Sequence, residues 1–199
     1  VVMTLSHVKI VGSGLIGTSI GLGLALKGVG VTMQDLDSRA QGLADDLVKS
    51  ASSSPIELVI FATPIGALKS LIDGEFAANP KAAFIDISSV KSKVKVEVST
   101  SKVPMSRFLP THPMAGREIG GATSARADLF DGRSWIYCPQ THAGAKVDQD
   151  VIDAGGSPFL RSPSFTVLPS RVIFAADVMA CECSPFPSLS VMTSLPSLF

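Results

Sequence analysis

Cysteine is scarce in this chain, and its spacing excludes several classes of protein. The three cysteines, Cys138, Cys181 and Cys183, include no C-x-x-C pair, so they do not predict a zinc site. An odd number of cysteines also argues against a small secreted domain held together by disulfides. The three histidines are widely separated along the chain. We therefore expect no metal site and a reducing, cytoplasmic location.

The chain also has no net charge. Its 17 basic and 17 acidic residues cancel, and no long run of one sign occurs. A nucleic-acid-binding protein typically carries a basic stripe, which this composition does not provide. The uncharged stretch over residues 10–26 is slightly short for a membrane span, and five glycines interrupt it. We therefore expect a small-molecule partner rather than a nucleic acid or a membrane.

Helical periodicity is missing from the end of the chain. Residues 157–199 contain nine serines and six of the 13 prolines. Proline breaks the interior of a helix, and it interrupts most windows of this segment that would be long enough for one. The sequence predicts an irregular Ser/Pro-rich tail over 157–199, which follows a domain over 1–156.

A glycine motif near the start of the chain carries the most information. Residues 7–11 form a short apolar run, and Gly12, Gly14 and Gly17 follow it in G-x-G-x-x-G spacing at the head of a helical stretch that ends near Lys27. Strand, glycine turn and helix together are typical of a dinucleotide-binding site. The first glycine allows a tight turn, the second lets a pyrophosphate approach the backbone, and the third allows close packing of helix and strand. The diphosphate would bind at the positive end of the helix dipole.

An acidic residue stands at the spacing that such a site requires. Asp35 ends the second predicted strand, eighteen residues after Gly17. Its carboxylate can accept the ribose hydroxyls and would repel a 2′-phosphate, which favours NAD over NADP. Asp37 and Arg39 lie close by, and a shift in register could exchange their roles with that of Asp35. A glycine-rich turn without a ligand is the alternative, but the strand, the helix and the acid together favour a nucleotide.

Apolar runs alternate with helical patterns along the rest of residues 1–156. Hydrophobic residues make up 46% of the chain and the mean hydropathy is +0.38, as expected for a parallel sheet covered on both faces. In the helix predicted over 38–49, we expect Leu43, Leu47 and Val48 to share one face. The fold class is therefore α/β, a doubly wound, Rossmann-type and mostly parallel sheet. The predicted strands cover residues 7–11, 30–34, 57–62, 82–87 and 135–138, and the predicted helices cover residues 15–27, 38–49, 65–76 and 89–98.

Four local patterns occur in a fixed order over residues 7–156. Together they resemble the prephenate/arogenate dehydrogenase family of tyrosine biosynthesis. The patterns are Gly12-Ser13-Gly14-Leu15-Ile16-Gly17-Thr18-Ser19, Phe61-Ala62-Thr63-Pro64, Asp86-Ile87-Ser88-Ser89-Val90-Lys91 and His112-Pro113-Met114-Ala115-Gly116, the last followed by Leu129-Phe130-Asp131-Gly132 and Trp135-Ile136-Tyr137-Cys138-Pro139.

The resemblance implies an oxidoreductase that moves a hydride from the substrate ring to NAD while carbon dioxide leaves. It places the catalytic base on His112, since a neutral imidazole suits proton transfer near pH 7, and Ser89 would be its hydrogen-bonding partner. The implied cofactor-binding residues are Gly12, Gly14, Leu15, Ile16, Gly17, Asp35, Thr63, Pro64 and Ser89.

Several of these residues have alternative explanations. His112 could cap a strand end against Pro113, and Ser89 could be the N-cap of the helix over 89–98. Lys91 could contact the cofactor or the substrate, or it could be a solvated helix lysine. Arg117 and Arg133 are candidates for a substrate carboxylate. His142 matches no pattern and receives no role.

The tail departs from the resemblance. Family members continue into a helical domain that dimerises and closes the substrate site, and its histidines and arginine are not found after residue 156. We therefore expect a truncated or replaced ending without the homodimer interface, and an activity that could be impaired. Prephenate and arogenate stay open as substrates. A catalytically silent dinucleotide-binding module, or another small NAD(P)-dependent reductase, is the alternative function.

Overall fold

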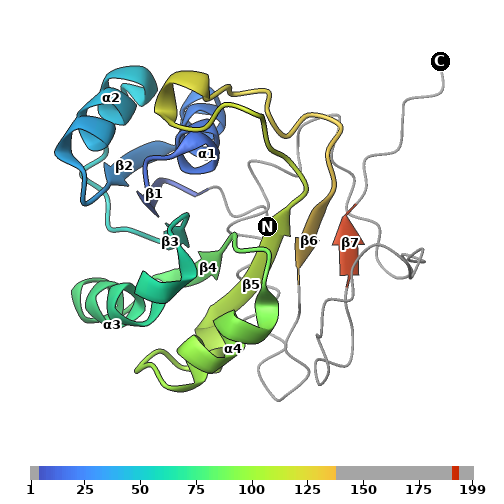
Figure 1. Ribbon diagram of the computed structural model, residues 1–199. Helices are drawn as coiled ribbons and strands as arrows, with labels where there is room; N and C mark the ends of the chain where they lie inside the picture. Colours follow the sequence, from blue (N-terminus) through green and yellow to red (C-terminus); the bar gives the residue numbers. More distant parts are fainter. Residues whose placement is uncertain (1–4, 138–189, 193–199) are drawn as a thin grey trace.

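The computed structural model describes residues 5–137 and the backbone of a strand at 190–192 (Figure 1). The other residues of the predicted tail, the three cysteines and His142 lie outside the described residues. The strands are β1 (His7–Val11), β2 (Gly30–Gln34), β3 (Leu58–Phe61), β4 (Ala83–Asp86), β5 (Phe108–Pro113), β6 (Trp135–Tyr137) and β7 (Ser190–Met192). The helices are α1 (Leu15–Leu26), α2 (Ser38–Val48), α3 (Leu68–Ala78) and α4 (Lys91–Ser99), with short 3₁₀ turns η1 (Ile65–Ala67), η2 (Met105–Arg107) and η3 (Ala122–Ser124).

The described strands form one sheet in the order β2-β1-β3-β4-β5-β6-β7. Strands β1 to β5 are parallel, whereas β6 runs antiparallel to β5 and β7 antiparallel to β6. The chain moves from β1 to one side for β2 and then crosses to the other side for β3. This reversal confirms the doubly wound α/β fold, and it creates a crevice at the carboxyl ends of β1 and β3. The tail expected to be irregular contributes β7.

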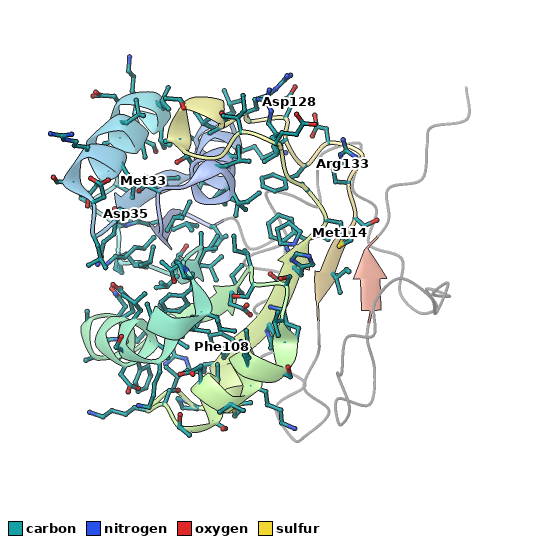
Figure 2. All side chains as sticks on the ribbon, viewed as in Figure 1. Met33, Asp35, Phe108, Met114, Asp128 and Arg133 are labelled. Carbon is teal, nitrogen blue, oxygen red and sulfur yellow. The ribbon has the colours of Figure 1, made fainter. Side chains whose placement is uncertain are left out.

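Helices cover both faces of the parallel sheet, α1 and α2 on one and α3 and α4 on the other (Figure 1). Because side chains alternate along a strand, each strand contributes to both layers. Ile60 packs with α1 in the first core and the neighbouring Phe61 packs with α3 in the second. Figure 2 shows Met33 in the first layer and Phe108 in the second. The two-sided burial explains why these strands are continuous apolar runs.

Of the three residues expected to share one face of α2, only Val48 is buried. Leu43 and Leu47 are 37% and 41% exposed, whereas Ala44 and Val48 are buried. The reason is a close approach of α1 and α2, since a Cβ atom added to Gly21 would lie 3.0 Å from a methyl group of Val48. The face of α2 that faces α1 is therefore that of Ala44 and Val48, and Leu43 and Leu47, one residue earlier, lie about 100° away from it around the helix.

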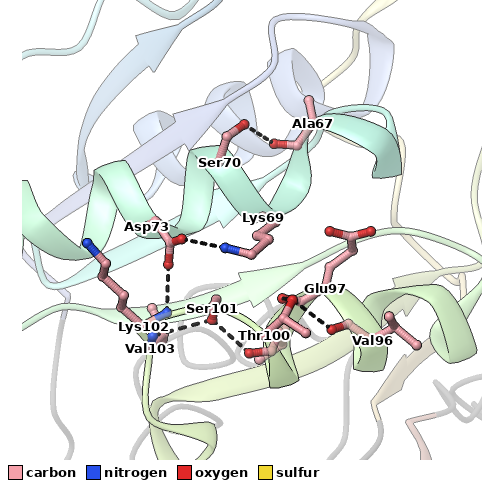
Figure 3. A network of polar contacts seen from close by, with 11 residues as sticks. Ala67, Lys69, Ser70, Asp73, Val96, Glu97, Thr100, Ser101, Lys102 and Val103 are labelled. Carbon is pink, nitrogen blue, oxygen red and sulfur yellow. Dashed lines mark hydrogen bonds and ion pairs between the residues drawn. The ribbon is translucent and has the colours of Figure 1, made fainter.

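A polar network ties α3 to the segment that follows α4 (Figure 3). The Asp73 carboxylate accepts a hydrogen bond from the Lys102 backbone N–H at 2.6 Å and one from Lys69 Nζ at 2.9 Å. These bonds, the Lys102 amide first, lower the pKa of Asp73. The network therefore links α3 to the end of the α4 segment, and the turn before α4 contributes to the site described next.

Candidate functional site

The glycine turn lies where β1 and β3 end side by side. Gly12 donates its N–H to the Gln34 carbonyl at 2.7 Å and has a φ of +110°, which side chains disfavour. A Cβ atom at Gly12 would clash with the backbone of Ala62, and one at Gly17 would clash with the Gly12 carbonyl. Glycine at both positions therefore lets the turn close between strand and helix.

Gly14 differs from the other two glycines of the motif. A Cβ atom added there would have no heavy atom within 4 Å, so the residue faces open space. Gly14 is also the N-cap of α1, and no side chain caps this helix. Leu15 and Ile16 occupy the first helical positions, where backbone N–H groups have no partner within the helix. This arrangement can hold an anion.

Asp35 faces the glycine turn. Its carboxylate accepts a hydrogen bond from the Ser13 N–H at 2.6 Å and one from the Asp37 N–H at 3.0 Å. The Asp37 side chain instead accepts from the Arg39 N–H at 2.9 Å and caps α2. The geometry therefore places Asp35, and not Asp37, beside the turn.

A cavity of about 370 Å³ opens at this switch point. The predicted residues Thr63 and Pro64 line it together with Gly12, Gly14 and Asp35. The Thr63 hydroxyl oxygen is buried without a hydrogen-bond partner. Sequence reasoning missed its apolar lining. That lining consists of Val11, Leu36, Ala62, Ala67 and Leu71. Leu36, which is 93% exposed, could have been noticed as an apolar residue directly after the acid.

His112 lies near the carboxyl end of β5, on the same edge of the sheet as the glycine turn. Its Nδ1 atom lies 3.3 Å from the carbonyl oxygen of Ile87, the residue after β4. A carbonyl can only accept, so Nδ1 carries the proton and Nε2 has the free lone pair in the neutral ring. Burial lowers the pKa of His112, against the opposing effect of the Ile87 hydrogen bond. The ring is therefore neutral near pH 7.

The structure places Ser89 differently from what the sequence predicted. Helix α4 begins at Lys91 with Val90 as its N-cap and without a side-chain cap, so the prediction of Ser89 as the N-cap is wrong. Ser89 is exposed, and the hydrogen bond described for the His112 ring goes to the Ile87 carbonyl. The reason lies in the next turn of chain, where Lys91 folds inward and starts the helix two residues later.

Lys91 is not a solvated helix lysine. Its Nζ atom lies 2.5 Å from Asp86 Oδ2, and the two side chains are 3% and 0% exposed. Neighbouring residues complete the cluster, since the Ser88 N–H donates to the same carboxylate at 2.9 Å and the Thr111 hydroxyl donates to the Asp86 carbonyl at 2.6 Å.

The two arginines considered for a substrate carboxylate are exposed and lie on the segment between β5 and β6. Arg117 donates to the Ser124 carbonyl at 3.0 Å. Figure 2 shows Arg133 on the stretch that leads into β6. Within residues 5–137, neither guanidinium forms a hydrogen bond with His112.

Known proteins are similar to this chain mainly over the part before the Ser/Pro-rich tail. The sequence model of the family described as "Prephenate dehydrogenase, nucleotide-binding domain" matches residues 25–154. "Probable prephenate dehydrogenase NovF" of Streptomyces niveus is 30% identical over 133 residues, which cover 65% of this chain and 37% of the relative. A cyclohexadienyl dehydrogenase of Zymomonas mobilis is 28% identical over 158 residues, which cover 74% of this chain and 54% of the relative. The chain thus spans about half or less of the length of these curated relatives.

A solved structure shares the fold. The prephenate dehydrogenase of A. aeolicus, crystallised in complex with hydroxyphenyl propionate and NAD+, superimposes with a TM-score of 0.61 and 20% sequence identity. The match covers 75% of this chain and 56% of that protein. At this identity the likeness concerns the arrangement of the sheet and its helices.

Proposed function

Because this chain belongs to the family of prephenate dehydrogenase nucleotide-binding domains, we propose that it binds NAD and supplies the base for oxidative decarboxylation of prephenate or arogenate. One observation carries the proposal: an uncapped helix start with open space over Gly14 lies beside Asp35 and shares a sheet edge with His112. The parts that the reaction needs, a binding site for the nucleotide and a neutral imidazole, therefore lie at the same edge of the sheet.

The residues around the cavity fit NAD. The space above Gly14, which a side chain would fill, accepts a diphosphate on the N–H groups that begin α1. Asp35 already lies within hydrogen-bonding distance of the turn and can accept ribose hydroxyls. The buried hydroxyl of Thr63 offers a further polar partner, and Leu36 and Leu71 offer apolar surface for a base.

When bound, NAD supplies the acceptor for the hydride. In the proposed reaction the substrate's ring hydroxyl loses its proton to His112 Nε2 as its oxygen becomes a carbonyl. The hydride leaves from the same carbon. The ring carboxylate departs as carbon dioxide, and its electron pair completes the aromatic ring as the carbonyl becomes a phenolate oxygen, which takes the proton back from His112. The hydrogen bond to Ile87 holds the imidazole while Nε2 takes the proton.

Replacement of the proposed base tests the catalytic half of the proposal. We expect His112→Asn to lower prephenate-dependent or arogenate-dependent NADH formation by about 10³-fold, as for the loss of a general base. The asparagine amide can still donate to the Ile87 carbonyl, so the local structure and the affinity for NAD should stay unchanged. NADH formation is followed by absorbance and NAD binding by fluorescence titration.

The outcomes of this experiment separate the candidate functions. Turnover that the substitution leaves unaffected would remove His112 from the mechanism. Binding of NAD without turnover on either substrate would identify a silent dinucleotide-binding module. Turnover on other carbonyl or imine substrates alone would identify a different small reductase.

The pH dependence follows from the ionisation of His112. The base must be neutral, and burial lowers its pKa below the usual value of 6.5. Activity is therefore retained to lower pH than for an exposed histidine and is lost as the pH falls through the lowered pKa. We expect the acid limb of kcat/KM for the substrate to have its midpoint below 6.5. A midpoint above that value would contradict the assignment.

The choice of nucleotide depends on Asp35. We expect Asp35→Ser to weaken NAD binding about tenfold and to bring the affinity for NADP closer to that for NAD, because the ribose acceptor and the repulsive charge are both lost. Asp37→Ala is the matched control. Because it removes the N-cap of α2, it should lower the free energy of unfolding by about 1 kcal/mol, and it should leave the preference for NAD over NADP unchanged. If Asp37→Ala changed the preference for NAD over NADP and Asp35→Ser did not, Asp37 would be the residue that contacts the ribose.

The remaining assignments are consistent with this function. We propose residues 1–156 as the nucleotide-binding domain, supported by a family match over 25–154, and a role in tyrosine biosynthesis in the cytoplasm. Within the part of the chain that the structure describes, no helix has the length and apolar character needed to cross a membrane.

A further inference from the structure

We propose that Asp86 is a positioning residue that, together with Lys91 and Thr111, holds the His112 imidazole in the tautomer with the proton on Nδ1. The consequence for catalysis rests on the proposed function, whereas the structural claim does not. The observation behind it is a set of contacts between buried or half-buried groups: the Asp86 carboxylate ties the turn after β4 to α4, and the backbone carbonyls of Asp86 and Ile87 in that turn contact Thr111 and His112.

The first link closes the turn that follows β4. Asp86 Oδ2 accepts from the Ser88 N–H at 2.9 Å and from Lys91 Nζ at 2.5 Å. The carboxylate thus ties the end of β4 to the first residue of α4. Since both charged side chains are almost wholly buried, the pair can rearrange only at the cost of exposing or separating its charges.

The second link joins this turn to the strand that carries the histidine. The Thr111 hydroxyl donates to the carbonyl of Asp86, and His112 Nδ1 lies 3.3 Å from the next carbonyl, that of Ile87. Two consecutive side chains of β5 thus contact two consecutive backbone carbonyls at the end of β4. The turn that presents the Ile87 carbonyl to the ring is therefore held by Asp86 on one side and Thr111 on the other, while the Ile87 N–H donates to the Phe61 carbonyl at 3.2 Å.

The charges of the cluster suit a neutral base. A lone carboxylate close to His112 would raise the pKa of the ring and convert it to a cation, which cannot accept a proton. Here burial lowers the pKa of His112, and the effect of Asp86, which raises it, is opposed by that of Lys91, which lowers it. On the other side of β5, the residue paired with His112 is the apolar Ile136. The ion pair therefore positions the ring without charging it.

Nitrogen NMR of the histidine-labelled chain tests the proposal, because Nδ1–H and Nε2–H rings have different ¹⁵N shifts. The signal of His112 is identified by its loss in His112→Asn. We expect the Nδ1–H form in the unsubstituted chain. In Asp86→Asn the ratio of Nδ1–H to Nε2–H should fall about tenfold, the equivalent of one hydrogen bond, and in Thr111→Val about threefold. The affinity for NAD should stay unchanged in both.

A matched control separates positioning from a general loss of structure. Glu75→Gln neutralises one partner of another buried pair, since Glu75 Oε1 of α3 lies 2.7 Å from Lys9 Nζ of β1, three strands away from β5. It should leave the tautomer of His112 unchanged. If Asp86→Asn does not fold, Thr111→Val decides, because it removes one hydroxyl and no charge.

The proposal would be overturned by an Nε2–H ring in the unsubstituted chain or by an unchanged tautomer in folded Thr111→Val. An effect of Glu75→Gln as large as that of Asp86→Asn would also overturn it. The NMR measurement needs no substrate. A confirmed Nδ1–H ring without turnover would therefore refute the proposed reaction and leave the positioning role in place.

Discussion

Gly17→Ala is expected to lower the free energy of unfolding by about 3 kcal/mol or more, and with it to abolish NAD binding. The added methyl group would overlap the Gly12 carbonyl oxygen and lie 3.1 Å from the Ala62 side chain. The Gly12 backbone, and the Ala62 Cβ atom that is bonded directly to its own backbone, cannot move aside as the end of a flexible side chain could. The strain must therefore separate α1 from β1 and β3, where the cavity lies. Urea unfolding followed by circular dichroism measures the loss.

Gly14→Ala is the matched control for this substitution. No atom lies within 4 Å of the added methyl group, so the free energy of unfolding should change by no more than about 1 kcal/mol. The methyl group would nevertheless occupy the space proposed for the diphosphate, and we expect at least a tenfold loss of NAD affinity. Unchanged affinity in Gly14→Ala would show that the diphosphate binds elsewhere. Unchanged stability in Gly17→Ala would contradict the close packing of the turn.

The parallel part of the fold could be predicted because local pattern and global arrangement agree there. Each of β1 to β4 is a short apolar run that is followed by a helical segment, which in a parallel sheet leaves few topologies. The register then brings the ends of β1 and β2 together, since Val11 pairs with Gln34. Gly12 and Asp35 therefore become neighbours without any further information.

Where the prediction failed, the cause was a contact between segments distant in sequence. A period of 3.6 residues does not reveal that α2 approaches Gly21 with Val48, which leaves Leu43 and Leu47 on a partly exposed face. Nor can the sequence around Ser89 show that Lys91 is drawn into the protein by a buried carboxylate. The strand β7 pairs with β6 across more than fifty residues, and no turn signal indicates such a pairing.

The spacing of the sequence does not decide whether Asp35 or Asp37 lies beside the glycine turn, but the N-cap of α2 does. Both residues follow β2, and both are acidic. Asp37 occupies the N-cap position of α2, where its side chain accepts from the Arg39 N–H. The preference of aspartate for this position removes it from the cavity and leaves Asp35 as the acceptor beside the glycine turn.

Asp86→Asn is expected to have the second large effect, a loss of about 3–5 kcal/mol in the free energy of unfolding. The substitution leaves the Lys91 ammonium buried opposite a neutral amide, and the desolvation of that charge is no longer compensated. The double variant Asp86→Leu/Lys91→Met removes both charges and should recover most of the loss, because a buried ion pair stabilises a protein little relative to apolar side chains of similar volume.

Asp128→Asn is the surface counterpart of this experiment. Asp128 pairs with Arg126 at 2.6 Å, but the two side chains are 52% and 57% exposed, and solvent screens the attraction. We therefore expect the unfolding transition of Asp128→Asn to coincide with that of the unsubstituted chain. Equal losses in Asp86→Asn and Asp128→Asn would mean that the Asp86–Lys91 pair is solvated in solution. In the double variant, stability could recover while the Nδ1–H tautomer of His112 does not. That result would separate the two roles of the pair, because apolar side chains can restore the packing, whereas only the carboxylate and the ammonium hold the turn that faces the histidine.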